Sequence, residues 1–326
     1  MEKKTRVTIK DVAKRANVTP QTVSRAFRGA HDISEKTRKE ILQIAAELGY
    51  VKNISATSLR CGTSRLVAVI YDNQLNLYFS IMLEYVQSNL RAQGYSMLMI
   101  SCRDRRLTKE VYLSALSHDV GGVFSFLEPE EEIGELIERY HVPVLLFGRR
   151  TDVKNVDCIH TDDFEGGRLV SGKFLENGCT RLGYVSEPFE ISCVYDRYAG
   201  FEEGLKEKGL KPAFVIDTGM FGLDERLLAL YENKKALPDG IFCFNDMLAF
   251  EVLCVLEKNG LPPTKVIGYD NLQREIHLPR QLTTVGADKA AMAKKATDMM
   301  IARMQNGDAE YVKLIEDVFL VDGSTV

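Results

Sequence analysis

Hydrophobic positions in the first 50 residues recur at the spacing of short amphipathic helices. Between residues 9 and 16 they fall at i, i+3, i+4 and i+7, which is one face of a two-turn helix. The same spacing predicts a second helix that begins at Pro20 and a third that follows Ser34. The residues expected to cap or end these helices are Thr8, Thr19, Ser34, Gly29 and Gly49. Two short helices closed by a third make a helix-turn-helix unit.

After residue 65, short apolar runs alternate with amphipathic stretches, which is typical of parallel sheets with helices on both faces. Strands are expected at 66–71, 95–101, 122–127, 142–147, 182–185, 214–217, 241–244 and 266–269. Helices are expected at 79–93, 107–117, 130–140, 163–177, 195–208, 223–233 and 246–259. A break near 150–160 predicts two Rossmann-like lobes. Segments 282–285 and 287–305 would cross back before a final strand pair within 311–321.

Composition fits such an α/β protein. The chain has 326 residues, of which 45% are apolar and 27% charged, enough for a sizeable core. No apolar run approaches the ~18 residues of a membrane span, and the charged N-terminus leads directly into the first helix. We therefore expect a cytoplasmic protein with no membrane partner. Seven cysteines without a C-x-x-C pair favour free thiols over disulfides or a zinc site.

Charge is distributed unevenly along the chain. The net charge is only −4, but residues 1–60 hold 13 Lys and Arg against 6 Asp and Glu. The first 60 residues therefore carry +7 and the remaining 266 carry −11. This asymmetry indicates that the basic head meets a polyanion and the acidic body does not. A basic head that is merely solvated would show the same asymmetry.

The outward face of the second predicted helix carries side chains that can read DNA: Gln21, Thr22, Ser24, Arg25 and Arg28. In the major groove, Gln pairs with adenine and Arg with guanine through two hydrogen bonds, and hydroxyls reach phosphates or bases. A generic helical hairpin with polar residues facing solvent would have the same spacing. Spacing alone therefore leaves both interpretations open.

A longer motif extends over this region. Residues 8–26 read TIKDVAKRANVTPQTVSRA, followed by ISEKTR at 33–38, ELGY at 47–50 and NISATSLR at 53–60. This stretch closely resembles the N-terminal signature of the LacI/GalR family of bacterial transcription regulators. The resemblance implies that Pro20, Gln21 and Arg25 read bases. It assigns phosphate contacts or capping to Thr8, Thr19, Thr22, Ser24, Arg28 and Ser34.

The segment at 53–59 is too short and too rich in β-branched residues to form a stable helix alone. In the family that it resembles, this hinge becomes helical on operator DNA. Its leucine then enters the minor groove. Asn53, Ala56 and Leu59 match that hinge, with Leu59 as the wedge. The family usually has Pro before this Asn, whereas Lys52 stands here, so we expect weaker ordering of the hinge.

Catalytic motifs are not found in the sequence. No G-x-G-x-x-G follows a predicted strand, and neither a phosphate-binding P-loop nor a G-x-S-x-G elbow occurs. The five histidines lie far apart and lack metal-ligand spacing. We therefore expect no enzyme activity, no cofactor and no metal.

Side chains suited to polyols lie instead where predicted strands end. Carboxylates and a guanidinium can bond several hydroxyls, while an aromatic ring covers the apolar face of a sugar. Each residue also has an ordinary explanation, such as a helix cap or a surface ion pair. Together they resemble the LacI/GalR effector site, which is similar to that of periplasmic sugar-binding proteins. The candidate effector residues are Asp72, Tyr78, Phe79, Arg197, Phe221, Asn245 and Asp270.

The sequence thus predicts an α/β protein with three parts. Residues 1–50 would form the helix-turn-helix DNA-binding domain, 51–62 the hinge, and 63–326 a two-lobed, periplasmic-binding-protein-like effector and dimerisation domain. The expected function is a homodimeric repressor of carbohydrate-utilisation genes that binds a pseudo-palindromic operator and responds to a sugar or sugar phosphate. Two alternatives remain. One is a regulator whose co-effector is a purine or a phosphocarrier protein. The other is a stand-alone sugar-binding protein, against which the basic head argues.

Overall fold

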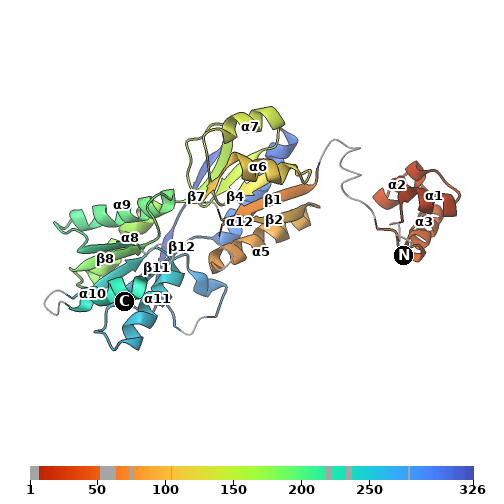
Figure 1. Cartoon of the computed structure of the whole chain (residues 1–326). Coiled ribbons are helices and arrows are strands. Elements are labelled where there is room, and N and C mark those ends of the chain that lie inside the picture. Colours follow the sequence, from red (N-terminus) through yellow and green to blue (C-terminus); the bar gives the residue numbers. More distant parts are fainter. Residues whose placement is uncertain are drawn as a thin grey trace. The chain divides into compact units, whose positions relative to one another are not determined.

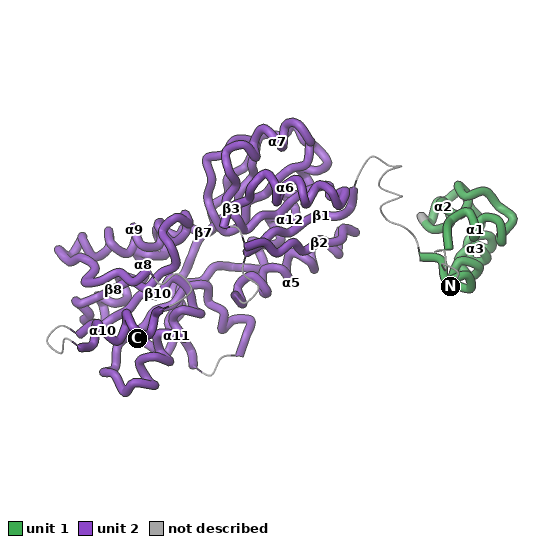
Figure 2. The backbone as a smooth tube through the Cα atoms, in the orientation of Figure 1, with its two compact units in different colours: residues 1–63 green, residues 64–326 purple. Residues whose placement is uncertain are grey.

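The computed structural model describes residues 7–51, 64–72, 76–103, 105–217, 222–232, 237–277 and 280–326. The chain separates into two compact units, residues 1–63 and 64–326 (Figure 2). No helix in the described ranges is long and apolar enough to cross a membrane.

The first unit is a three-helix bundle of α1 (Ile9–Arg15), α2 (Pro20–Arg28) and α3 (Glu35–Glu47). Its core brings together one face of each helix, with Val12, Val23 and Ile41 almost fully buried. The predicted caps are confirmed where they were expected. The Thr19 side chain accepts from the Thr22 amide at 3.2 Å, and Gly29 ends α2 with a φ of +68°. This is the helix-turn-helix arrangement that the apolar spacing predicted.

The second unit contains two lobes, each built on a six-stranded sheet (Figure 1). The first sheet has the order β13-β7-β6-β4-β1-β2 and the second β14-β12-β11-β10-β8-β9. All their pairs are parallel except β12 with β14. The strands of the first sheet are β1 (Leu66–Tyr71), β2 (Ser96–Ser101), β4 (Gly122–Ser125), β6 (Val144–Phe147), β7 (Val156–Thr161) and β13 (Lys313–Glu316). Those of the second are β8 (Leu182–Ser186), β9 (Phe214–Asp217), β10 (Gly240–Cys243), β11 (Lys265–Tyr269), β12 (Thr283–Gly286) and β14 (Phe319–Val321).

Helices cover both faces of each sheet. The first lobe contains α5 (Leu77–Ala92), α6 (Lys109–Leu116), α7 (Ile133–Tyr140) and α12 (Lys289–Gln305), with a small pair of strands, β3 (Arg106–Leu107) and β5 (Glu128–Pro129). The second contains α8 (Asp163–Glu176), α9 (Ser192–Lys206), α10 (Leu223–Glu232), α11 (Asp246–Lys258) and the short 3₁₀ turn η1 (Leu272–Arg274). Alternate residues of a strand enter opposite cores: Val67 and Val69 pack on one face of β1, Ala68 and Ile70 on the other. Burial on both faces explains why the central strands are almost continuously apolar.

Two expectations about this unit are wrong. The predicted break at 150–160 is occupied by β7, which pairs with β6 and β13 inside the first sheet. Its sequence interrupts the apolar run with Asp157, a buried carboxylate that binds the Arg303 guanidinium at 2.8 and 3.0 Å. The final strands also do not pair with each other, because β13 joins the first sheet and β14 the second.

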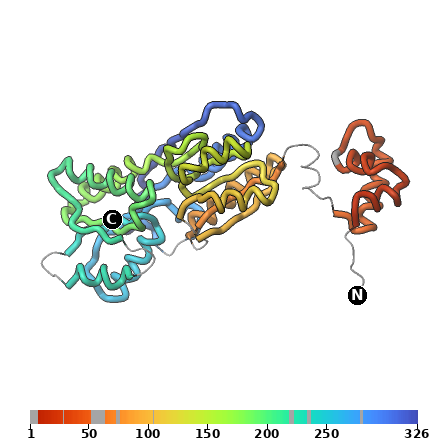
Figure 3. Tube along the Cα trace, turned by 45° about the horizontal axis from the view of Figure 1, so that its top comes forward, coloured from red at the N-terminus to blue at the C-terminus, as the bar shows by residue number. Residues whose placement is uncertain are grey.

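The chain consequently passes between the lobes three times, after β7, after β12 and after β13. The blue α12, from near the C-terminus, lies in the first lobe beside the orange and yellow elements (Figures 1 and 3). It packs against α5 and against β4, β6 and β7 of the first sheet. Each lobe is therefore assembled from segments that are distant in the sequence.

Candidate functional site

The first candidate surface is the outer face of α2. Pro20, Gln21 and Arg25 are exposed, while Val23 and Ala26 on the opposite face are buried. The Arg25 guanidinium lies 3.1 Å from a carboxylate oxygen of Asp32, and both side chains are about half exposed. A DNA base would therefore compete with Asp32 for Arg25.

The hydroxyls near this face are already engaged in capping. Thr19 also contacts the Thr22 hydroxyl at 2.9 Å, and the Ser34 side chain accepts from the Thr37 amide at 3.2 Å. The Thr8 amide and hydroxyl donate to the Asp11 carboxylate at 2.8 and 2.7 Å, which lowers the pKa of Asp11. The three capping hydroxyl groups lie at the N-termini of the three helices. A phosphate could also bind at these N-termini.

Several candidate DNA contacts can be placed only in part. Ser24 is partly exposed on α2. Arg28 is the last residue of that helix, but its side chain lies outside the described part of the structure. The hinge candidates Asn53, Ala56 and Leu59 lie outside the described residues altogether. Their assignment to DNA stays a prediction.

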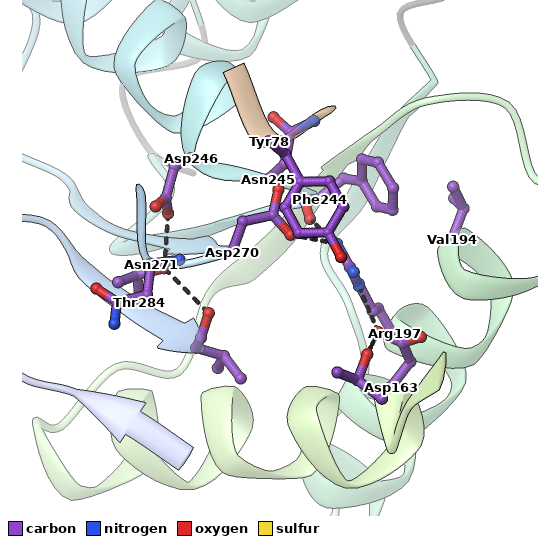
Figure 4. Close-up of polar contacts among 12 residues, drawn as sticks. Tyr78, Asp163, Val194, Arg197, Phe244, Asn245, Asp246, Asp270, Asn271 and Thr284 are labelled. Carbon is purple, nitrogen blue, oxygen red and sulfur yellow. Dashed lines mark hydrogen bonds and ion pairs between the residues drawn. The ribbon is translucent and has the colours of Figure 1, made fainter. Parts of the chain in front are cut away.

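The second candidate site centres on Arg197 of α9, which is only 7% exposed (Figure 4). Its Nε donates to Asp163 at 2.8 Å and its Nη1 to the Phe244 carbonyl at 2.7 Å. The guanidinium lies over the rings of Tyr269 and Phe244, 3.6 and 4.6 Å from their centroids. Burial opposes the charge, but nearby carboxylates, chiefly Asp163, raise the pKa of Arg197 well above its ordinary value. Arg197 is therefore a fixed cation at the carboxyl ends of the strands.

Asp270 follows β11 and lies 3.7 Å from Arg197. Its φ of +98° is a strained value for a residue with a side chain. Lys289 Nζ donates to the Asp270 carbonyl at 2.7 Å and so fixes this backbone. Burial raises the pKa of Asp270 to about 6, against the opposing effect of Arg197 and Lys289. The carboxylate therefore lies close to its protonation point near neutral pH.

The first lobe contributes Tyr78 and Asp72 to the same region. Tyr78 stands in the first turn of α5, where Asn76 accepts its amide at 3.0 Å, and it projects towards Arg197 and Asp270 (Figure 4). Burial, with the Asp270 charge, raises the pKa of Tyr78, so its hydroxyl stays a proton donor. One carboxylate oxygen of Asp72, just after β1, is buried without a hydrogen bond. Both lobes thus contribute polar side chains to the region around Arg197 and Asp270.

Two residues of this region were missed from the sequence. Glu187 follows β8, and burial together with the Asp72 carboxylate raises the pKa of Glu187. Arg149 follows β6 and is 8% exposed, and its positive charge opposes the rise in the pKa of Glu187. Both obey the strand-end rule that selected Asp72 and Asp270. Both strands, β6 and β8, were predicted from the sequence, so the strand-end rule could have selected these two residues as well.

Three other candidates differ in their placement, and of these Asn245 lies next to Phe244 in the cluster (Figure 4). Phe79 packs in the core of the first lobe, with its ring 5.1 Å from that of Phe126. Asn245 caps α11 by accepting the Leu248 amide at 2.8 Å, which is the ordinary explanation for an Asn at that position. Phe221 lies outside the described residues. In the part of the chain that the structure describes, no group of three or more His, Cys, Asp and Glu could hold a metal ion.

Two family models match the chain. Residues 8–53 match bacterial regulatory proteins of the lacI family, and residues 172–326 match a periplasmic binding protein-like domain. The HTH-type transcriptional repressor PurR of Vibrio campbellii is 28% identical over 314 residues, which is 93% of each chain.

Solved structures agree with this fold. The lac repressor dimer bound to operator and the anti-inducer ONPF superposes with a TM-score of 0.84 at 22% identity, covering 98% of this chain and 99% of that one. A periplasmic binding protein/LacI transcriptional regulator from Alkaliphilus metalliredigens, complexed with D-xylulofuranose, has a TM-score of 0.71 at 25% identity. That match covers 80% of this chain and 99% of the other. The expected combination of a helix-turn-helix domain with a two-lobed, periplasmic-binding-protein-like α/β domain is confirmed.

Proposed function

The chain belongs to the LacI family of bacterial regulatory proteins, and on that premise we propose that it represses genes as a homodimer on a pseudo-palindromic operator. It is a DNA-binding transcription regulator and not an enzyme. We further propose that residues 1–50 bind DNA, that 51–62 form the hinge, and that 63–326 bind the effector and dimerise. A small molecule held between the two lobes would change operator affinity.

The observation that carries the DNA proposal is the exposed face of α2, with Gln21 and Arg25 turned away from the core. Replacing Arg25 by Ala should cost about 1–3 kcal/mol of binding free energy on the selected operator and relax preference at one base pair per half-site. The exposed Lys39 of α3 offers a matched control, since Lys39→Ala should weaken operator and random DNA equally. If Arg25→Ala also weakened both equally, Arg25 would be a phosphate contact only.

For the effector we propose a sugar or a sugar phosphate. Carboxylates from both lobes, Asp72, Glu187 and Asp270, can accept several hydroxyl hydrogens, and the Tyr78 hydroxyl can donate. The buried Arg149 would take the ring oxygen of a free sugar or the phosphate of a phosphorylated one. The xylulofuranose complex of the Alkaliphilus relative supports this class of ligand.

A purine is the second candidate, and the HTH-type transcriptional repressors named PurR among the relatives support it. A flat base would need a free aromatic face, and Arg197 already lies over the rings of Phe244 and Tyr269. Tyr78 is then the ring left for stacking among the described residues of this cluster. This arrangement favours the sugar.

Thermal denaturation with a panel of probes tests both candidates. We expect D-ribose, D-xylulose or another free sugar, or the matching phosphates, to raise Tm, whereas hypoxanthine and guanine should not. Tyr78→Phe should reduce the ligand-induced shift without changing Tm in buffer. Tyr140→Phe, at an exposed position in the first lobe, is the matched control. A shift with a purine alone would replace the sugar proposal by the second candidate.

A further inference from the structure

The N-terminus of α9, the helix that carries Arg197, has no side-chain cap from its own lobe among the described residues. The residue at the N-cap position is Ile191, whose side chain makes no capping hydrogen bond. The first amides of a helix lack partners within the helix and need an outside acceptor. Here the Ser192 amide donates to a carboxylate oxygen of Glu128 at 2.8 Å. Glu128 lies in β5 of the first lobe, so one lobe caps a helix of the other.

Arg150 ties the same end of α9 to the first lobe. It follows β6, and its amide donates to the Ser192 hydroxyl at 3.3 Å. Its guanidinium binds Asp196 through Nε at 2.6 Å and Nη2 at 3.1 Å. Such a two-point bond fixes direction as well as distance. The first lobe therefore holds α9 at its first residue and again one turn later.

The next residue after Asp196 is Arg197, the centre of the candidate effector site. A helix is stiff over five residues, so a displacement of its first turn is carried to Arg197. Asp196 binds the first lobe, while Arg197 binds Asp163 and Phe244 within its own lobe. The adjacent side chains of Asp196 and Arg197 thus bind partners in different lobes.

We propose that Glu128 and Arg150 are positioning residues. By holding the N-terminal turn of α9, they fix the position of the Arg197 side chain, so that this position depends on how the two lobes are arranged. When the lobes separate, α9 loses its cap and its bidentate partner together, and Arg197 loses its fixed position. A ligand that needs Arg197 in place therefore favours the lobe arrangement in which Glu128 caps α9. This inference rests on the proposed effector role of Arg197.

Hydrogen exchange of the full chain without ligand tests the capping step. In Glu128→Ala, the amides of Ser192, Cys193 and Val194 should exchange at least several-fold faster than in the parent protein, with those of β8 unchanged. Glu130→Ala is the matched control, because it removes the same charge two residues away, where no side-chain bond to α9 is formed. Glu128→Gln removes the charge but keeps an oxygen that can accept from the Ser192 amide, so it should restore most of the protection. If the charge of Glu128 were what protects these amides, Glu128→Gln would exchange as fast as Glu128→Ala. Equal protection in Glu128→Ala and Glu130→Ala would overturn the proposal.

Chemical labelling of arginines tests the step from α9 to Arg197. Phenylglyoxal should modify Arg197 several-fold faster in Glu128→Ala and in Arg150→Ala than in the parent protein. Arg303, buried in the first lobe against Asp157, serves as the internal control for folding and should react at an unchanged rate. Unchanged labelling of Arg197 in both variants would show that α9 does not transmit the lobe arrangement. Because neither readout uses a ligand, a failed effector screen would leave these results standing.

Discussion

Lys289 is the first residue of α12 and is only 2% exposed, which is unfavourable for a cation on two grounds. Burial removes its hydration, and the N-terminus of a helix repels positive charge. Its ammonium donates hydrogen bonds to the carbonyls of Asp270 and Asn271 at 2.7 and 3.0 Å, and it forms an ion pair with the Glu275 carboxylate at 3.1 Å. These acceptors come from the second lobe, whereas α12 packs in the first. We predict that Lys289→Met strongly destabilises the protein.

The magnitude follows from what the substitution leaves behind. Glu275 is 14% exposed and would keep only the Tyr85 hydroxyl, 3.4 Å away, among its described partners. Removing one member of a buried ion pair costs about 3–5 kcal/mol, because the other charge stays buried. Two carbonyls would lose a donor as well. With an unfolding entropy of about 2.1 cal/mol/K per residue, each kcal/mol corresponds to roughly 1.5 °C for a chain of this size, so we expect Tm to fall by about 4–7 °C.

Calorimetry or urea unfolding of the 326-residue chain measures this effect. Lys294→Met is the matched control, since it lies in the same helix, is 67% exposed and pairs with Asp298 at 2.6 Å. An exposed pair of this kind is worth about 0–1 kcal/mol. If Lys289→Met changed the free energy of unfolding no more than Lys294→Met, the buried ammonium would not hold the strained Asp270 segment as described.

Three further predictions concern charge. Burial, with the Asp270 charge, raises the pKa of Asp246 to about 7. Between about pH 4 and pH 7 the folded state then binds more protons than the unfolded state, so the free energy of unfolding should decrease as pH rises through this window. In Asp246→Asn, urea unfolding should show a smaller decrease of this free energy over the same window. Asp32→Asn releases Arg25 and removes a negative charge, so gel-shift titrations should show tighter binding to both operator and random DNA; unchanged affinity on both would contradict this. Arg197→Lys keeps the charge but loses the planar fork, and it should abolish the effector response in operator binding while leaving effector-free affinity near normal; a normal response would remove Arg197 from the site.

Local chemistry explains which elements could be predicted. The ends of α2 depend on Thr19, Pro20 and Gly29, whose capping behaviour needs no distant partner. β7 was missed because the partner that makes Asp157 acceptable in a buried strand is Arg303, 146 residues away. Patterns along the chain do not contain such pairings.

The residues of the candidate site likewise fall into those that the sequence could predict and those that depend on distant partners. Arg197 and Asp270 were found because strand ends converge at one edge of a sheet. Phe79 was assigned to the site, but it packs in the core, since only one of two adjacent aromatic residues at the start of α5 can face the other lobe. The roles of Glu128 and Arg150 depend on the packing of one lobe against the other, and no local spacing signals that contact.

The three passages of the chain between the lobes have a consequence during synthesis. The first lobe needs α12 over one face of its sheet, but the ribosome reaches Lys289 only 128 residues after Thr161, the end of β7. At ~5–20 residues per second this interval lasts on the order of ten seconds. Throughout it, the side chains of Val67, Val69 and Phe124 that share a core with α12 lack part of their cover. Until α12 emerges, the first lobe of the nascent chain therefore exposes apolar side chains that are buried in the folded protein. A chaperone would bind the nascent chain during this interval.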